Sequence, residues 1–345
     1  MNVRHSISEL SFDELHTKLE QWGHSRYRAG QLIGWLYKHN AVSFDLMSNL
    51  PKQLIAQLSE EYDCCSLSVV KTITSGEGTV KYLFQTVDGQ YIEGVSMPDG
   101  DLRHTVCIST QIGCPWGCLF CASGKHGFVR NLSVGEIVDQ VRIMSSNQPI
   151  SNIVIMGGGE PLMNFKQLEA AYRIFTDDAA YAIGKRRVSV STAGYVPGIE
   201  QLIRSDIRPQ LAVSLHAPTD DKRSQVLPIN RKYPINKLME TCKKYAQLSR
   251  RPVSFEYIVI PGFNNGDDDA RALVKLLKKY PAKINLIPLN PVEGFSYRCP
   301  TEEEVYEFQS MLLSAGFVVT IRWSKGQDIG AACGQLRSAQ SQSDL

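Results

Sequence analysis

From about residue 105 onward, short apolar runs alternate with amphipathic stretches. This pattern constrains the fold more than any other feature of the sequence. Each apolar run except the last is followed by a segment with helical spacing of its apolar residues. Repeated strand–helix units give parallel strands covered by helices. Seven strands fall short of the eight of a closed barrel, so the sequence predicts an α/β fold with a partial TIM-like (β/α) barrel whose site lies at the carboxyl ends of the strands. The predicted strands are 105–111, 152–156, 187–191, 210–214, 253–259, 283–288 and 318–322.

The first 65 residues differ from the barrel in their pattern. Apolar side chains recur there at three-to-four spacing, as in Leu32, Trp35 and Leu36, which is the period of an amphipathic helix. A further helix is expected to begin at Pro51, because proline is favoured at the start of a helix. We interpret residues 1–65 as a small N-terminal helical accessory domain.

Residues 66–104 alternate apolar and polar side chains, which is the period of a half-buried strand. Asp88-Gly89 separates two such runs, and this dipeptide between alternating strands is a strong hairpin signal. We therefore predict a β-hairpin extension that links the helical domain to a barrel of residues 105–325. Residues 326–345 form a C-terminal loop that ends in a polar, flexible tail.

Composition indicates an ordinary soluble protein. With 345 residues, 43% of them hydrophobic, the chain is long enough to bury a full core. No run approaches the about eighteen uncharged apolar residues that span a bilayer, so no membrane partner is expected. Nine cysteines, an odd and clustered count, and no charged-then-apolar leader after Met1 argue for the reducing cytosol. A net charge of +2 neither requires nor excludes a nucleic acid.

Three cysteines carry the strongest chemical signal. Cys114, Cys118 and Cys121 have C-x3-C-x2-C spacing, follow the first predicted barrel strand and supply only three ligands. Three thiolates suit a [4Fe–4S] cluster whose fourth iron stays open for a substrate. With Phe120 before the third cysteine and the exit at 121–124, the motif resembles that of the radical S-adenosylmethionine superfamily.

A zinc site is the alternative for the same cysteines. Structural zinc needs four protein ligands, and Cys107, His104 or His126 would supply the fourth. Zinc pairs more often show two C-x2-C units, and the sequence has no second pair. This alternative implies a zinc-bound RNA-binding protein without catalytic function.

The second predicted strand ends in a glycine run, Met-Gly-Gly-Gly-Glu-Pro at 156–161. Glycines at a strand end let a ligand approach the backbone, and Glu160 can accept hydrogen bonds from an ammonium group. Taken alone, the loop is equally consistent with a tight strand-to-helix turn. A dinucleotide loop is a weak reading, because Leu162 occupies the third glycine position of that pattern. Downstream of three cluster cysteines, the run favours the methionine end of S-adenosylmethionine.

Small or hydrogen-bonding side chains lie at the carboxyl ends of three further predicted strands. Each alone would more often be ordinary loop structure, but their shared position favours contacts to the ribose, carboxylate and adenine of a cofactor. His216 is also consistent with a structural histidine, and nothing assigns it a proton-transfer role. The segments are 191–194, 214–216 and 290–291.

Two further cysteines are placed at the same end of the predicted barrel. Cys107 lies on the first strand, and Cys333 lies between small residues in the loop after the last strand. A buried, inert thiol is the usual state of a cytosolic cysteine. A cysteine beside glycine on a loop, however, is accessible and can act as a nucleophile.

Together, these motifs resemble the RlmN/Cfr family of radical S-adenosylmethionine RNA methyltransferases. The order and spacing match over nearly the whole chain. The helices that include 27–37 resemble that family's accessory RNA-binding domain. Besides the three cluster cysteines, the matching segments are 107–114, 158–162, 186–192, 214–218, 228–230, 284–288 and 331–336.

The resemblance implies a radical mechanism that uses both additional cysteines. Carbons 2 and 8 of adenine are electrophilic, so an ordinary polar transfer from the sulfonium is not possible and a radical route is required. The resemblance implies one [4Fe–4S] cluster and two S-adenosylmethionine molecules per turnover. Cys333 takes a methyl group from the first S-adenosylmethionine and becomes S-methylcysteine. A radical formed from the second S-adenosylmethionine activates this methyl group, which then adds to the adenine ring. Cys107 resolves the protein–RNA bond through a transient disulfide with Cys333. Glu93 matches the acceptor of the ring proton, although a plain strand glutamate is a fair alternative.

The resemblance also implies cofactor contacts and partners. The substrate is 23S rRNA, with tRNA as a further candidate, and the electron donor is a flavodoxin or ferredoxin. A cytoplasmic monomer is the default. Basic runs at 185–187 and 231–232 are candidate phosphate contacts, although such runs are usually solvated surface. The residues implied to contact S-adenosylmethionine are Gly159, Glu160, Ser191, Ser214, Leu215, His216 and Asn290.

The main choice within the family is carbon 2 of adenosine, as in RlmN, against carbon 8, as in Cfr. Pro161 favours carbon 2, because Cfr-like sequences tend to have alanine there. The glycine run, Trp323 and Lys325 differ from the family's usual residues. These differences concern the fit of the substrate, not the type of reaction.

Overall fold

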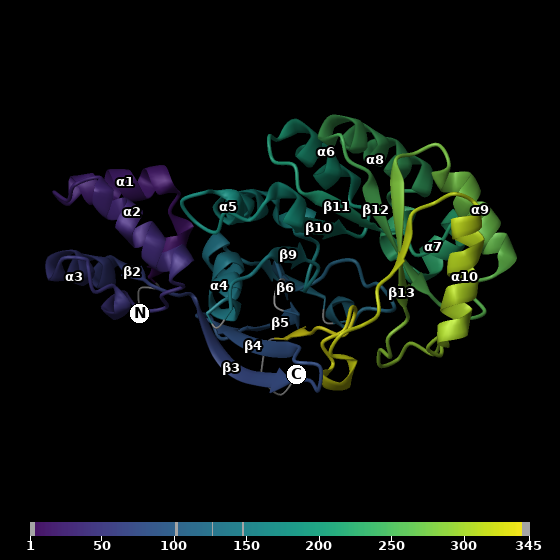
Figure 1. The fold of residues 1–345 in the computed structure, drawn as a ribbon, viewed down its shortest axis with the longest axis horizontal. Coiled ribbons are helices and arrows are strands. Elements are labelled where there is room, and N and C mark those ends of the chain that lie inside the picture. The colour runs from purple at the N-terminus through teal and green to yellow at the C-terminus, as the bar shows by residue number, and fades with distance from the viewer. Residues whose placement is uncertain (1–3, 101–102, 126, 147, 340–345) are drawn as a thin grey trace.

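A computed structural model of the chain describes residues 4–100, 103–125, 127–146 and 148–339 (Figure 1). The candidate zinc ligand His126 and the tail residues 340–345 lie outside the described residues. The molecule is elongated, with the N-terminal helices at one end and the last helices of the barrel at the other (Figure 1). Within the described ranges, no helix combines the length and the apolar character needed to cross a membrane.

Seven parallel strands form the predicted partial barrel. Short apolar runs rich in β-branched residues favour these strands, and the helices between them force a parallel arrangement. Along the described sheet, β6 pairs with β5 on its other side and β14 lies at the far end, so the barrel is open. This confirms the predicted fold class. In order across the sheet, the strands are β6 (Arg103–Cys107), β9 (Asn152–Ile155), β10 (Val188–Thr192), β11 (Gln210–Ser214), β12 (Val253–Val259), β13 (Ala282–Pro288) and β14 (Val319–Ile321).

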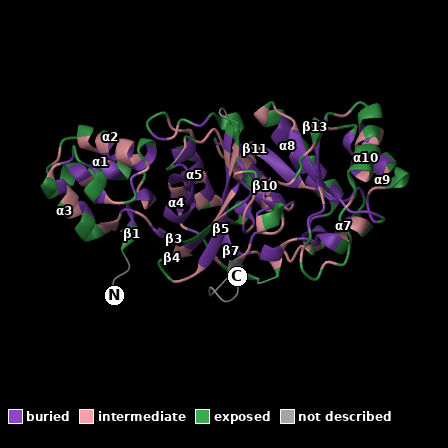
Figure 2. Ribbon diagram, turned by 60° about the horizontal axis from the view of Figure 1, so that its bottom comes forward, coloured by how far each residue is buried: buried purple, intermediate pink, exposed green. Residues whose placement is uncertain are grey.

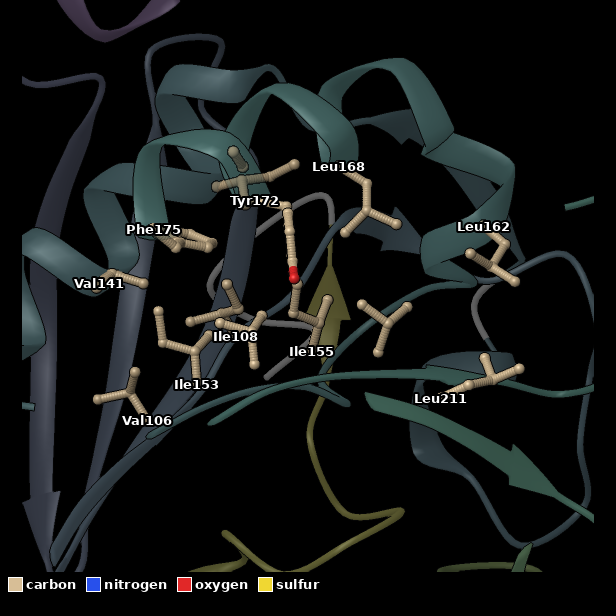
Figure 3. Close-up of a cluster of buried hydrophobic side chains, with 14 of the residues drawn as sticks. Val106, Ile108, Val141, Ile153, Ile155, Leu162, Leu168, Tyr172, Phe175 and Leu211 are labelled. Atoms are coloured by element: carbon tan, nitrogen blue, oxygen red, sulfur yellow. The ribbon is translucent and has the colours of Figure 1, made fainter. Parts of the chain in front are cut away.

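Helices cover the outside of this sheet, and the core lies between the two layers. Tyr172 and Phe175 of α5 point toward Ile153 and Ile155 of β9 (Figure 3), and all four are buried. Most of the helices expose their outward face (Figure 2), whereas the helix at residues 134–144 is buried along almost its whole length. The longer helices are α4 (Val134–Met144), α5 (Phe165–Thr176), α6 (Val196–Arg204), α7 (Asp220–Val226), α8 (Ile235–Ser249), α9 (Asp267–Leu277) and α10 (Glu302–Ser314). Short helical turns are η4 (Ala122–Gly124), η5 (Pro161–Asn164), η6 (Lys185–Arg187), η7 (Pro228–Arg231) and η8 (Gln327–Ile329).

The β-hairpin extension continues the barrel sheet beyond β6. Its strands pair antiparallel in the order β5, β4, β3, and the predicted turn contains Gly89 at φ +83°, a conformation that glycine adopts without steric cost. A short C-terminal strand also pairs with β5, so the end of the chain returns to this side of the barrel. The strands are β3 (Leu67–Thr74), β4 (Val80–Thr86), β5 (Tyr91–Asp99) and β15 (Ser338–Ala339).

The first predicted barrel strand, 105–111, is shorter in the structure. β6 ends at Cys107, and the chain then forms a separate small hairpin of β7 (Gln111–Gly113) and β8 (Phe128–Asn131). Ser109 explains the break, because its hydroxyl donates to the carbonyl of Glu93 (2.8 Å) and its N–H donates to a side chain of α4 (2.8 Å). Apolar spacing alone did not reveal this change of direction.

The N-terminal residues form the predicted helical domain. Ser11 and Glu14 form a capping box at the start of α1, which satisfies backbone N–H groups that the helix itself leaves unpaired. The helix expected at Pro51 begins directly after it. The elements are β1 (His5–Ser6), η1 (Ile7–Glu9), α1 (Phe12–Gln21), α2 (Tyr27–Ile33), η2 (Gly34–Lys38), η3 (Phe44–Leu46), α3 (Lys52–Glu61) and β2 (Tyr62–Asp63).

A buried ion pair joins this helical domain to the barrel. Asp139 and Arg142, both on α4 and both fully buried, are 2.8 Å apart. Asp139 also accepts hydrogen bonds from the N–H (2.6 Å) and hydroxyl (2.7 Å) of Ser66, and Arg142 donates to the carbonyl of Cys64. A buried charge is tolerated only when it is paired and hydrogen-bonded, so the pair fixes how the two parts dock.

We predict that Arg142→Met destabilises the protein, because it leaves the Asp139 carboxylate buried without its cation. The expected loss is about 3–5 kcal/mol of unfolding free energy, measured by denaturant titration of the cluster-free chain. Arg173→Met is the control, because Arg173 pairs with Asp206 on the exposed surface and its loss should have little effect. Equal stability of the two variants would contradict the proposal that this buried ion pair joins the helical domain to the barrel.

Candidate active site at the barrel mouth

The three motif cysteines lie in a loop between β7 and β8, at the carboxyl end of the first barrel strand. The loop is closed at its base, where the N–H of Cys114 donates to the carbonyl of Gly127 (2.9 Å). Gly113 has φ +72°, and a Cβ there would lie 1.7 Å from the same carbonyl oxygen, so only glycine fits this position. The three cysteines are partly exposed and free.

The donor set of this loop fits an iron–sulfur cluster. Burial raises the pKa of all three thiols, to about 12 for Cys114, and the neighbouring thiols add to the effect at Cys114 and Cys118. Stable thiolates here therefore need a bound cation, and an all-sulfur donor set is the one that such clusters use. Within the described residues, no group of three His, Cys, Asp or Glu side chains converges closely enough to hold a single metal ion.

The glycine run after β9 packs against the strand that leads to the cysteine loop. A Cβ on Gly157 would lie 2.7 Å from the carbonyl oxygen of Ile108, and one on Gly159 would lie 2.5 Å from the Gln111 side chain. The carbonyl of Gly158 accepts the N–H of Thr110 (2.9 Å). Close approach of the Ile108 backbone and of the Gln111 side chain thus explains Gly157 and Gly159, and the loop brings the next residue, Glu160, to the site.

Glu160 is a buried carboxyl group held by backbone donors. Its oxygens accept the N–H of Ala193 (2.8 Å) and of Leu162 (3.3 Å), and its own N–H donates to Gln111 (2.8 Å). Burial raises the pKa of Glu160 to about 7, although the hydrogen bonds oppose the shift. A positively charged ligand group would therefore stabilise the carboxylate strongly.

Arg223 organises the ends of β10 and β11. Its guanidinium is fully buried and donates to the carbonyls of Ala193 (2.7 Å), Ser214 (2.9 Å) and Leu215 (3.1 Å). Ser191 and Ser214 are both partly exposed at these strand ends. Sequence reasoning missed Arg223, because an arginine in a polar segment gives no sign of burial.

His216 is a neutral ring with a fixed tautomer. Burial lowers its pKa to about 3, and its Nδ1 accepts the N–H of Ile258 (3.1 Å), which places the proton on Nε2. The ring meets Phe120 of the cysteine loop edge-on, with centroids 4.7 Å apart. His216 therefore presents a fixed donor, not an acid–base group that titrates near neutral pH.

The loop that carries Cys333 is clasped onto the cysteine loop. The N–H of Ala122 donates to the carbonyl of Gly334 (2.7 Å), and the hydroxyl of Ser123 donates to that of Leu336 (2.7 Å). From the other side, Asn290 donates to the carbonyl of Cys333 itself (3.0 Å). We call these three hydrogen bonds the clasp.

Cys107 and Cys333 differ in their surroundings. Cys107 is buried on β6, in an apolar cluster with Val95, Ala331 and Leu336, whereas Cys333 is exposed and both thiols are free. Burial raises the pKa of Cys107 to about 12, and the nearby Cys333 adds to the shift. Crowding by protein atoms also raises the pKa of Cys333, although solvent reaches its side chain. Neither thiol is therefore ionised at neutral pH unless a further group takes its proton.

Glu93 lies on β5, buried beside the end of the same loop. One of its oxygens accepts the N–H of Arg337 (2.8 Å), and the other is 3.1 Å from the ammonium of Lys81. The structure thus brings Glu93, Cys107 and the loop of Cys333 together from three segments. Lys81 was missed, because a lysine on an alternating strand normally faces solvent.

Glu256 and Arg322 were also missed. Glu256 is buried on β12, accepts a hydrogen bond from Asn285 (2.7 Å) and lies 3.9 Å from Arg322. Burial raises its pKa, and its charge helps to raise the pKa of Cys333. A charged residue inside the apolar run of a predicted strand was the signal available in the sequence.

Comparison with known proteins shows which class of protein this chain belongs to. The model of the radical SAM superfamily matches residues 108–277, which hold the cysteine loop and most of the barrel. The model of the ribosomal RNA large subunit methyltransferase N-terminal domain matches residues 6–63. The fold is similar to that of a radical SAM methyltransferase from Sphaerobacter thermophilus, with a TM-score of 0.93 and 42% identity over 96% of this chain and 99% of that one. The class is therefore that of radical S-adenosylmethionine enzymes.

Two relatives define the family more closely. The dual-specificity RNA methyltransferase RlmN of Syntrophotalea carbinolica is 44% identical over 97% of this chain and 90% of that protein. The probable RlmN of Thermus thermophilus is 44% identical over 90% of this chain and 88% of that protein. The chain belongs to the RlmN family of radical S-adenosylmethionine RNA methyltransferases. Family membership implies S-adenosylmethionine and a [4Fe–4S] cluster, and it favours the catalytic interpretation over the zinc-bound, non-catalytic alternative.

We predict that Gly334→Ala opens the clasp. Gly334 has φ +82°, and a Cβ there would lie 2.5 Å from the carbonyl oxygen of Phe120. Gly89→Ala is the matched control, because Gly89 has φ +83° with no atom within 4 Å. Hydrogen exchange of residues 333–337 should accelerate about tenfold or more only in Gly334→Ala, since that variant adds a backbone clash to the conformational strain. Equal protection in both variants would contradict the clasp.

Proposed function

We propose that this enzyme methylates carbon 2 of an adenosine in 23S rRNA, and of one in tRNA, through S-methylcysteine at Cys333. The observation that supports this most is the clasp, which ties the loop of Cys333 to the loop of the three motif cysteines. Cys107 and Glu93 border the same loop. A methyl group on Cys333 would then lie between the cluster loop and an entering base.

Cys114, Cys118 and Cys121 would hold the [4Fe–4S] cluster, which supplies the electron that cleaves S-adenosylmethionine to a 5′-deoxyadenosyl radical. Glu160 binds the ammonium group of S-adenosylmethionine. The fixed Nε2–H of His216 and the hydroxyls at the ends of β10 and β11 orient its other polar groups. The proposed contacts are Gly159, Glu160, Ser191, Ser214, Leu215, His216 and Asn290.

Each turnover uses two S-adenosylmethionine molecules. In the first step, the Cys333 sulfur loses its proton and takes the sulfonium methyl group. The 5′-deoxyadenosyl radical takes a hydrogen atom from the S-methyl group, and the resulting carbon radical adds to adenine C2, which tethers the RNA to Cys333. The unpaired electron of this adduct would return to the oxidised cluster, and Glu93 takes the ring proton, so that the ring regains its aromatic form. The Cys107 thiol gives up its proton and attacks the Cys333 sulfur. The S–S bond forms as the S–C bond breaks, the released carbon takes a proton to complete the methyl group, and cellular thiols reduce the disulfide.

The partners follow from the same chemistry. A flavodoxin or ferredoxin supplies the electron, and the enzyme acts in the cytoplasm as a monomer. The basic residues Lys185, Arg186 and Arg187 of η6 are exposed, as are Arg231 and Lys232, and they suit phosphate contacts. The target base must be unstacked to reach a site inside the barrel mouth, which favours a loop or junction of the RNA.

The position of methylation is tested in cells that lack their own enzyme. Expression of this chain should yield 2-methyladenosine in digested 23S rRNA and tRNA, measured by mass spectrometry. Cys333→Ala is expected to abolish it, because the methyl carrier is lost. Recovery of 8-methyladenosine would support the Cfr-like alternative, and the absence of both would overturn the proposal.

Cys107→Ala should trap the RNA on the protein. Without its resolving thiol, the enzyme still adds the Cys333 carbon to adenine but cannot break the S–C bond. A covalent protein–RNA species should accumulate on denaturing gels, whereas the control Cys242→Ala, which changes a thiol buried in α8, should release product normally. A Cys107→Ala variant that turns over at the wild-type rate would refute the resolving role.

Binding of S-adenosylmethionine should depend on pH through Glu160. The pKa of this carboxyl is raised from 4.5 to about 7, so the carboxylate that attracts the ligand ammonium forms as the pH rises through 7. Affinity of the reconstituted protein, measured by equilibrium dialysis, should rise severalfold from about pH 6 to about pH 7.5. Glu160→Gln should bind more weakly, with no such rise. The same pH profile in both proteins would exclude Glu160 as the ammonium ligand.

A further inference from the structure

Lys81 is a largely buried cation that has no role in the reaction proposed above. It lies on β4, and its side chain is 16% exposed. Its ammonium is 3.1 Å from Glu93 Oε1 and donates to the carbonyl oxygen of Gly330 at 3.5 Å. The first contact reaches the neighbouring strand, and the second reaches the loop that leads to Cys333.

The sheet register places Lys81 and Glu93 on one face. Lys81 is opposite Val95 in the β4–β5 pair, and Glu93 lies two residues before Val95. Because side chains alternate along a strand, Glu93 and Val95 point the same way, and Lys81 meets Glu93 diagonally. Val95 packs against Cys107, so this face is the one that borders the reacting cysteines.

The two carboxylate oxygens of Glu93 are held from different sides. The N–H of Arg337 donates to Oε2 (2.8 Å), and Lys81 holds Oε1. Each carboxylate oxygen has two lone-pair positions, so these contacts leave room for an incoming proton. They also restrict rotation of the carboxylate, because turning it would break both contacts.

We propose that Lys81 is a positioning residue for the proton-transfer step: its ammonium, anchored at Gly330, holds the Glu93 carboxylate toward the adenine ring of the tethered RNA. The inference rests on the proposed function, in which Glu93 takes the ring proton. A general base must lie within about 2.6–3.2 Å of the proton that it abstracts, so a carboxylate free to rotate would act poorly. Removing Lys81 also leaves the buried carboxylate without a cation, which favours a different orientation or a water partner.

The test compares Lys81→Met and Lys81→Arg with Lys71→Met in the full-length, cluster-loaded enzyme. Lys71 lies on the adjacent strand β3 and is exposed, so its loss controls for removal of a positive charge from this sheet. Three quantities are measured: S-methylation of Cys333 by peptide mass spectrometry, covalent protein–RNA species on denaturing gels, and release of methylated RNA. Wild type, Glu93→Gln and Cys107→Ala are measured in parallel.

Lys81→Met should keep S-methylated Cys333 and accumulate the covalent species, while product release falls about a hundredfold, the lower range for loss of a general base. Lys81→Arg should restore part of the release, because it keeps a cation with hydrogen-bond donors. Lys71→Met should match the wild type. This pattern places the defect after addition to the ring, which a general loss of folding would not do.

Three results would overturn the inference. Lys81→Met could release product like Lys71→Met, it could lose S-methylation of Cys333, or it could stall without a covalent species. If Glu93→Gln gives no covalent species while Cys107→Ala does, the role of Glu93 fails and that of Lys81 fails with it. If the wild type produces no methyladenosine, the proposed function itself fails, independently of Lys81.

Discussion

The clasp between the Cys333 loop and the cysteine loop is the interaction on which the site depends. Hydrogen bonds from Ala122 and Ser123 fix a segment near the C-terminus against a loop more than two hundred residues earlier in the chain, and a third from Asn290 holds this segment from the other side. Gly334 makes the approach possible, because its backbone has a left-handed conformation and a side chain there would strike Phe120. The same segment then pairs with β5, where Glu93 lies.

Burial governs the electrostatics around this clasp. It raises the pKa of the motif thiols, of Cys107 and of Cys333, and it raises that of Glu160 toward neutrality. Burial thus favours the neutral form of each of these groups until a partner charge arrives. Such shifts are typical of functional sites. Lys81 and the N–H of Arg337 hold the two carboxylate oxygens of Glu93 beside these groups.

The sequence predicted the architecture better than it predicted the contacts within the site. Local apolar periodicity and the Asp88-Gly89 turn were sufficient for the barrel strands, the hairpin and the helical domain, since each depends on neighbouring residues. The sequence pattern did not predict the break after Cys107, because that break depends on hydrogen bonds from Ser109 to distant segments. Motif spacing indicated the cysteines and Glu160 as candidate site residues, whereas Lys81, Arg223 and Glu256 make their contacts across strands, which one sequence without relatives does not display.

The central claim is that the methyl carbon reaches RNA by way of Cys333, and an isotope experiment tests it most directly. Protein carrying a deuterated S-methyl group on Cys333 is mixed anaerobically with unlabelled S-adenosylmethionine, a reductant and RNA for a single turnover. The account predicts that the new methyl group on adenosine contains deuterium, measured by mass spectrometry of the digested RNA. A first-turnover methyl group without deuterium would show that the carbon comes directly from S-adenosylmethionine and would contradict the account.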